Sequence, residues 1–287
     1  MNFKRHKFRL CPTAAIVLVI AGCAPQMHKS GFLCPGKNST AQALSILKCH
    51  SQSAVPLRAN GQCRLHYYAN QKLQKENFPV KLWLNPPSEI YLQGDIAFDP
   101  RAIIAGLNED EVWLAIKLKE VSTYWWGIWP GWAYTESLNI NPKLLLEAFG
   151  ATQLGDEQYW SLSNEDNFDV LIKHNGKGMV IKKLYIDSCD YLVRRIEYFN
   201  ADGQTAVVAE MDKYKQIAKG FFIPCVIEVI LIAAGKDEEG FRIVLDSAKS
   251  AVFSNKQHNI LFNRPKPQGF EHIYKIAEDG SMIEQIQ

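Results

Sequence analysis

The sequence lacks the motifs that mark the common enzyme classes. It contains no GxSxG nucleophile elbow, no phosphate-binding P-loop, no GxGxxG fingerprint and no CxxC pair, each of which places reactive groups at a fixed spacing. Its histidines form no HExxH pair, and its cysteine spacings match no zinc pattern. We therefore predict no catalytic residue, no metal site and no cofactor. An envelope hydrolase with paired carboxylates stays an alternative, because such pairs have no recognisable spacing in a sequence.

A strong charge of one sign and long hydrophobic runs are also missing. The chain has 32 Lys and Arg against 30 Asp and Glu, a formal net charge of +2, which leaves no basic footprint for a nucleic acid. No run approaches the ~18 apolar residues of a membrane-spanning helix, and the longest late run, Val226 to Ala234, is interrupted by Glu228. A hydrophobic content of 47% is nevertheless ordinary for a globular protein with a core.

The start of the chain has the pattern of a bacterial lipoprotein signal. Residues 1–10 are basic, an apolar AAIVLVIA stretch follows, and Ile20-Ala21-Gly22-Cys23 matches the lipobox. We predict that residues 1–22 are a cleaved signal peptide and that Cys23 carries the lipid. Cleavage removes four basic residues and no acidic one, which changes the net charge from +2 to −2. In enterobacterial lipoproteins an Asp after the lipidated cysteine favours retention in the inner membrane. The resemblance of this segment to theirs, with Ala24 in place of Asp, implies anchoring in the outer membrane, facing the periplasm.

Five cysteines remain between the predicted lipidation site and the end of the chain. In an oxidising compartment an odd number permits two disulfides and one free thiol. Cys34, Cys49 and Cys63 are close in sequence, so a pairing among them is expected. Cys189 and Cys225 lie in predicted strand regions and could pair with each other or be buried as thiols.

Hydrophobic periodicity predicts a mainly β domain over residues 39–287, after a lipidated and flexible tether over 23–38. Helices are expected at 39–48, capped by Ser39 or Thr40, and at 141–149, with Pro142 in its first turn. The gaps between the expected strands are too short for helices, which favours an antiparallel meander of about eleven strands that curls into an incomplete barrel. Residues 263–280 are expected to form a last helix or loop and a frayed tail. The expected strands lie at 64–71, 79–85, 88–98, 111–118, 121–129, 158–162, 168–175, 178–187, 191–200, 206–217, 221–234 and 241–253.

The order of these segments resembles a known superfamily. PVKLWLNPPSEIYLQGD (79–95), EVWLAIKL (111–118) and VSTYWWG (121–127) are similar to the opening meander of the lipoprotein-carrier proteins LolA, LolB and LppX, with residues 82–94 and 108–127 as the matching stretches. The Pro-bearing strand FFIPCVIEV (221–229) resembles a late strand of their barrel. The resemblance implies a half-open barrel with a greasy cavity under a helical lid, formed near 39–51 or 141–149, that holds acyl chains. It implies no residue-level site.

An aromatic cluster is the most unusual local feature of the sequence. Six of the seven tryptophans lie between Trp83 and Trp132, and tryptophan suits a cavity mouth or a membrane interface because it is apolar with one polar edge. We predict a ligand-cavity rim formed by Trp125, Trp126, Trp129 and Trp132. The alternative is that alternate residues of one strand belong to the core and that Trp129 to Trp132 form a packed turn.

Arg194 and Arg195 are consecutive in a predicted strand, so their side chains point to opposite faces. One of them could reach a lipid headgroup inside the barrel. Alternatively, both are solvated or paired with Glu197 and Glu210.

These observations lead to one functional hypothesis and two rivals. The first is a non-enzymatic, monomeric envelope lipoprotein that binds a hydrophobic ligand, either a lipid or the acyl chain of another lipoprotein, such as a 16-carbon palmitate chain. A permanent anchor argues against a free shuttle and favours a LolB-like acceptor. The first rival is a protein-interaction or stress-sensing module on the same fold. The second is the envelope hydrolase named above, which would need a polar cleft with converging acidic residues.

The rim hypothesis makes a first prediction. Replacing Trp129 and Trp132 with Ser should leave folding intact and abolish binding of a fluorescent lipid probe, because the apolar entrance is lost. Fluorescence titration measures the binding, and circular dichroism measures the folding. Unaltered binding would overturn the rim.

Overall fold

The computed structural model describes residues 34–69, 71–96, 99–118, 121–128, 141–232, 239–277 and 280–285. They belong to one compact unit, Leu33–Gln287. The predicted signal peptide and Cys23 lie outside the described residues. None of the described helices is both long enough and apolar enough to cross a bilayer.

The described strands form a single unclosed sheet of fifteen strands in the order β15-β14-β6-β5-β4-β3-β2-β1-β13-β12-β11-β10-β9-β8-β7. Neighbours are antiparallel except β14 and β6, which run parallel. The strands are β1 (Leu57–Ala69), β2 (Lys72–Asn85), β3 (Glu89–Ile96), β4 (Asp99–Leu107), β5 (Glu111–Leu118), β6 (Val121–Ile128), β7 (Trp160–Glu165), β8 (Phe168–His174), β9 (Val180–Asp187), β10 (Val193–Phe199), β11 (Thr205–Ala218), β12 (Phe221–Leu231), β13 (Glu239–Ser250), β14 (His272–Ile276) and β15 (Met282–Glu284).

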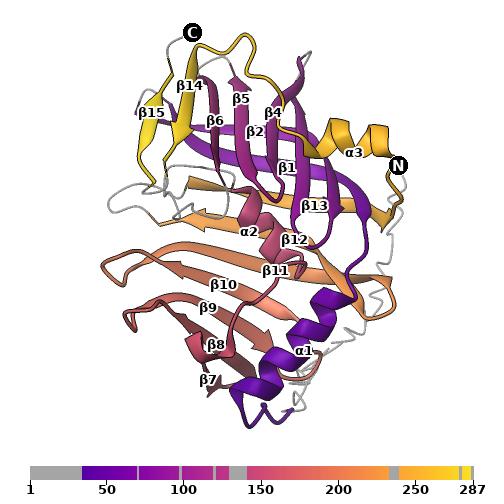
Figure 1. Ribbon diagram of the computed structural model, residues 1–287, viewed down its shortest axis with the longest axis vertical. Coiled ribbons are helices and arrows are strands. Elements are labelled where there is room, and N and C mark those ends of the chain that lie inside the picture. The colour runs from indigo at the N-terminus through magenta and orange to yellow at the C-terminus, as the bar shows by residue number, and fades with distance from the viewer. Residues whose placement is uncertain are drawn as a thin grey trace, which may run out of the picture. The chain divides into compact units, whose positions relative to one another are not determined.

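The sheet consists of two meanders, β1–β6 and β7–β13, which are joined where β13 pairs with β1. Figure 1 shows the strand direction turning between the upper meander and the lower one, as expected from the right-handed twist of a long sheet. Alternate residues of β1 are buried on one face, which we call the inner face. The predicted mainly β, incomplete barrel is confirmed.

The sheet has more strands than the approximately eleven expected. Three were missed, namely β4, β14 and β15. β4 begins at Asp99-Pro100 and contains Gly106, residues that are typical of turns. The expected helix or frayed tail at 263–280 is wrong in its second half, because β14 joins the sheet beside β6. That pairing connects residues far apart in sequence, so no local pattern could predict it.

Two helices lie on the inner face, and both were predicted. In α1 (Thr40–Gln52) the Ser39 side chain accepts a hydrogen bond from the Gln42 N–H and caps the helix. In α2 (Pro142–Ala148) Asn141 caps the first turn, and Gly150 ends the helix with φ +64°. α1 packs against β7, β8 and β12, whereas α2 packs against β3, β4, β5 and β11. In Figure 1 α2 lies over the middle of the sheet and α1 over its lower part.

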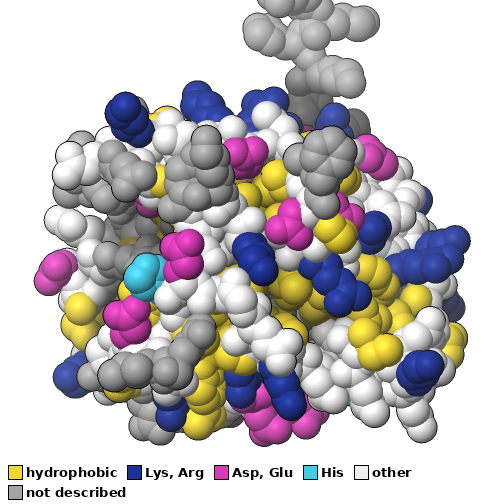
Figure 2. Space-filling view, turned by 90° about the horizontal axis from the view of Figure 1, so that it is seen from above, with side chains coloured by type: hydrophobic (Ala, Val, Ile, Leu, Met, Phe, Trp, Pro, Cys, Tyr) yellow, Lys and Arg dark blue, Asp and Glu magenta, His cyan; other side chains and the backbone are white. Residues whose placement is uncertain are grey.

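The outer face of the first meander has a cover of its own. α3 (Asn255–Phe262), which the sequence analysis missed, begins with a capping box between Ser254 and Gln257 and packs against β3. Phe262 and Ile273 close over Tyr91, Trp113 and Tyr124. Several aromatic residues of the first meander, Trp113 and Tyr124 among them, therefore belong to a second hydrophobic core on the outer face, which we call the outer core. Figure 2 shows both acidic and basic side chains on the face it presents.

The N-terminal end of the unit is fastened to the second meander. Cys34 forms a disulfide with Cys189, which differs from the pairing expected among Cys34, Cys49 and Cys63. The fully buried Asp169 carboxylate accepts hydrogen bonds from the Lys37 backbone N–H at 2.9 Å and 3.2 Å. The described part of the expected tether, residues 34–38, is thus held against β8 and the turn before β10. Cys49, Cys63 and Cys225 are free thiols.

A glycine under a tryptophan supplies the second prediction. A Cβ atom on Gly106 would lie 2.2 Å from the buried Trp113 ring, so Gly106→Ala should lower the free energy of unfolding by about 1–3 kcal/mol through overpacking. Gly176→Ala is the matched control, since no atom lies within 4 Å of its Cβ position. Urea denaturation measures both. Equal stability of the two variants would contradict the packing described here.

Candidate ligand-binding site

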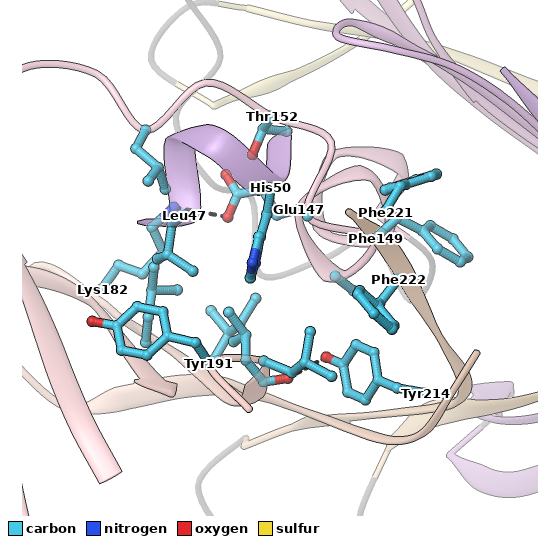
Figure 3. Close-up of a pocket in the computed structure, with 17 residues that line it drawn as sticks. Leu47, His50, Glu147, Phe149, Thr152, Lys182, Tyr191, Tyr214, Phe221 and Phe222 are labelled. Atoms are coloured by element: carbon cyan, nitrogen blue, oxygen red, sulfur yellow. Dashed lines mark hydrogen bonds and ion pairs between the residues drawn. The ribbon is translucent and has the colours of Figure 1, made fainter. Parts of the chain in front are cut away.

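A pocket lies between the inner face of the second meander and the two helices α1 and α2, which we call the lid (Figure 3). Strands β9–β12 form its floor, and α1 and α2 with the segment after α2 form its roof. Most of the residues that line it are apolar. They are Leu47, His50, Glu147, Ala148, Phe149, Gly150, Thr152, Leu154, Lys182, Leu184, Tyr191, Leu192, Val193, Ile196, Tyr214, Phe221 and Phe222.

Local sequence explains how the roof is built. Leu47 and His50 are three residues apart on α1, so they lie on the same side of the helix and both face the pocket. α2 stops at Phe149, and the turn at Gly150 leads the chain back over the floor to Leu154. The lid is therefore two short helices rather than one continuous layer.

The pocket is small in this structure. Its volume is about 60 Å³, which corresponds to roughly two water molecules, whereas sites for drug-sized ligands have about 300–1,000 Å³. This volume is too small for a 16-carbon chain.

One end of the pocket is charged. The Glu147 carboxylate of α2 lies 2.8 Å from the Lys182 ammonium of β9 and accepts a hydrogen bond from the Tyr198 hydroxyl. Lys143, one turn earlier on α2, lies 4.0 Å from the same carboxylate. The side chains of Glu147 and Lys182 are only 9% and 12% exposed, so this ion pair is a buried contact between the lid and the sheet.

The surroundings of Glu147 keep it ionised. Burial alone would raise its pKa, but attraction to Lys182 and Lys143, together with the hydrogen bonds from Lys182 and Tyr198, outweighs burial and lowers the pKa to about 2. Burial lowers the pKa of Lys143, and Lys182 adds to this effect while Glu147 opposes it. The carboxylate is thus the negative centre of a cluster of ammonium groups.

The opposite end of the pocket is aromatic. The hydroxyl of Tyr214 donates a hydrogen bond to the carbonyl of Val193, and the Arg194 guanidinium lies 5.0 Å from the centre of the Tyr214 ring. Burial lowers the pKa of His50, against the attraction of Asp190. Figure 3 shows Tyr214 and Phe222 on the side away from Lys182.

The two described rim tryptophans lie on opposite faces of β6. Trp125 packs against the inner core. Trp126 packs with the outer core, where the guanidinium of Arg264 lies 4.1 Å and the ammonium of Lys275 5.4 Å from its ring centre. Neither is among the residues that line the pocket. Trp129 and Trp132 lie outside the described residues, so the rim stays a prediction.

The two arginines are paired with acids. Arg195 forms ion pairs with Glu197 at 2.7 Å and Glu210 at 3.7 Å, the partners considered from the sequence. Arg194 pairs instead with Asp190 and Asp187.

Sequence reasoning missed Glu147 and Lys182. A signal for Lys182 was present in the strand VIKKLYID, because Lys182, Leu184 and Ile186 alternate onto one face, and that face is apolar. A lysine at a core position of a strand indicates a buried partner. Nothing in the sequence identified Glu147 as that partner.

Comparison with known proteins supports the fold. No protein-family profile and no curated protein matches the sequence. A putative outer membrane lipoprotein-sorting protein domain from Vibrio parahaemolyticus is similar in structure, with a TM-score of 0.52, 9% identity, and coverage of 77% of this chain and 97% of that one. A LolA superfamily protein from Nitrosomonas europaea has a TM-score of 0.48 and 10% identity, with coverage of 75% of this chain and 96% of that one. A DUF1329 family protein from Desulfovibrio piger has a TM-score of 0.49 and 11% identity, with coverage of 76% of this chain and 96% of that one.

These likenesses concern the fold. The likeness to the Vibrio domain extends over 97% of that chain. The curved, mainly β fold expected from the sequence is therefore also found in a solved structure.

The buried ion pair gives a third prediction. Because the pKa of Glu147 is lowered in the folded state, its contribution to stability is present above the ordinary carboxyl pKa near 4.5 and is lost as the pH falls through about 2. Glu147→Gln should therefore cost about 3 kcal/mol at neutral pH, and this deficit should shrink towards pH 2.

Urea denaturation at a series of pH values measures this effect. Glu210→Gln is the control, since that carboxylate is 56% exposed in its ion pair and should cost less than about 1 kcal/mol. A deficit for Glu147→Gln that does not change with pH would contradict the assignment.

Proposed function

We propose that this chain is a membrane-anchored envelope lipoprotein that binds a hydrophobic ligand, a lipid or a lipoprotein acyl chain, beneath the lid. It would act without catalysis, as a LolB-like acceptor on the periplasmic side of the outer membrane. The observation that carries the proposal is an apolar pocket between a curved sheet and two short helices. The Vibrio domain of the same fold, which is described as an outer membrane lipoprotein-sorting domain, supports it.

The free energy gained by burying an acyl chain is larger than the cost of opening the ion pair between the lid and the sheet. Each CH₂ group moved out of water contributes about 0.8 kcal/mol, so a 16-carbon chain supplies roughly 12 kcal/mol. Moving the Glu147 carboxylate out of its surroundings, which include Lys182, Lys143 and Tyr198, costs about 3 kcal/mol if the lowered pKa is converted to free energy. The leucines of α2 that leave the core, Leu144 to Leu146, can pack against the incoming chain instead of water. Burial of the ligand therefore exceeds the cost of breaking the contact.

The attachment of the tether supports a membrane-bound acceptor. Cys34 follows the predicted lipidated Cys23 by eleven positions, a distance that a chain can span over at most about 40 Å. Cys34 is bonded to Cys189, immediately before the pocket residues Tyr191 to Val193. A lipid on Cys23 would thus be tied to the part of the unit that carries the pocket.

A second candidate is a protein-interaction or stress-sensing module on the same fold. The small volume of the pocket, about 60 Å³, favours it, because an inner face that stays filled has no room for an acyl chain. Capture of a ligand separates the two candidates.

Lipid extraction with mass spectrometry tests the proposal on residues 24–287, exported to the periplasm without lipidation. We expect phospholipid or acyl chains at near one per protein. Leu154→Trp, which fills the pocket, should lower this occupancy at least about fivefold. Ile172→Trp, at a half-buried position that does not line the pocket, should leave it unchanged. An empty protein that also excludes a fluorescent fatty acid would favour the interaction module.

A further inference from the structure

Four side chains form a row across the inner face at the charged end of the pocket. Each is paired in register with the next on the neighbouring strand. Trp160 of β7 pairs with Lys173 of β8. Lys173 pairs with Lys182 of β9, and Lys182 pairs with Tyr198 of β10. The ammonium groups of Lys173 and Lys182 lie 5.4 Å and 5.8 Å from the centre of the Trp160 ring, and Lys182 also lies 5.7 Å from that of Tyr198. Two cations thus sit side by side between two aromatic rings.

This arrangement is electrostatically unfavourable by itself. Like charges directly opposite each other on neighbouring strands destabilise a sheet. Burial lowers the pKa of Lys173, and repulsion from Lys182 adds to that effect. Among the described residues, Lys182 is paired with the Glu147 carboxylate, whereas no carboxylate lies within ion-pair distance of Lys173. The two ammonium groups therefore share a single carboxylate among the described residues, and one positive charge is not neutralised in the closed structure.

The one carboxylate that the lysine pair has belongs to the lid. Glu147 is carried by α2, whereas Trp160, Lys173, Lys182 and Tyr198 all belong to the sheet. When α2 moves to admit a ligand, Lys182 and the Tyr198 hydroxyl lose the acceptor that they share. A buried cation without a counter-charge is costly, so an open pocket would attract another anion to Lys182.

The apolar floor begins beside this row. Leu184 follows Lys182 by two residues on the same face, and Ile196 is the register partner of Leu184. Two residues along a strand span about 7 Å. A head group held by Lys182 would therefore place the first carbons of its chain over Leu184 and Ile196.

We infer that the ligand of this pocket is an anionic amphiphile, whose carboxylate or phosphate replaces Glu147 on Lys182, Lys173 and the Tyr198 hydroxyl while its acyl chain covers the apolar floor. This inference rests on the function proposed above and adds the chemical class of the ligand. In the closed state, the Glu147 carboxylate occupies the position that the head group of the ligand takes in the open state. The same residue closes the empty pocket and is displaced when the pocket fills.

Photo-crosslinking of the full-length lipoprotein in phosphatidylcholine vesicles tests the inference. Three photoactivatable probes share a 16-carbon chain and differ in the head group, which is a carboxylate, a phosphate monoester or a neutral alcohol. Mass spectrometry measures the labelling of peptides within residues 141–200. We expect at least one anionic probe to label these peptides about tenfold more than the alcohol does, and the preferred head group distinguishes a fatty acid from a phospholipid.

The variants isolate the head-group contact. Lys182→Met should lower anionic labelling at least about fivefold and leave alcohol labelling unchanged. Lys183→Met is the matched control, because Lys183 is the next residue, faces the opposite side of the sheet near Phe199 and removes the same charge. Lys173→Met, which breaks no ion pair, repeats the test should Lys182→Met fold poorly. Glu147→Gln should increase anionic labelling, because it weakens the competing contact.

The outcomes separate the two proposals. Equal labelling by the alcohol and by both anionic probes in the unaltered protein would overturn the inference and leave the proposed function standing. Absence of labelling by all three probes would overturn the proposed function itself. An equal loss of anionic labelling in Lys182→Met and Lys183→Met would show that overall charge, rather than this row, attracts the probe, and it would also overturn the inference.

Discussion

The pairing of β1 with β13 is the constraint on which the rest of the structure depends. Ten register pairs, from Leu57 with Ser250 to His66 with Gly240, join the two meanders into one sheet. The strands approach so closely that a Cβ atom on Gly61 would lie 2.1 Å from the Val244 carbonyl oxygen. Without this ladder the second meander would have no fixed position relative to α2, and the pocket would lack its roof.

The lid belongs to both halves of the sheet. α2 stands between the meanders in sequence and contacts β3, β4 and β5 of the first and β11 of the second. Its leucines fill the core, and Glu147 reaches the lysine row on β8 and β9. Apolar packing and one buried ion pair therefore hold the pocket closed together. Burial of an acyl chain can replace the packing, whereas only another anion can replace the charge, which links the shape of the pocket to the chemistry of its ligand.

Prediction from the sequence succeeded where the pattern is local. The inner-face alternation of β1 and β2, the Ser39 and Asn141 caps and the stop at Gly150 all follow from neighbouring residues. It failed where the decisive contact is distant. β14 is a strand because it lies beside β6, and the contact of Trp126 with Arg264 on the outer face joins residues that are 138 positions apart.

The sequence by itself determined the class of fold, the two lid helices and the predicted lipoprotein signal, because periodicity, capping and the lipobox are properties of short segments. Only the tertiary structure decided the order of the fifteen strands, the Cys34–Cys189 disulfide and the small volume of the pocket. It also brought Glu147 to Lys182, although 34 residues lie between them in the chain. Such a contact depends on how the curved sheet and the lid meet in space, which no segment specifies alone.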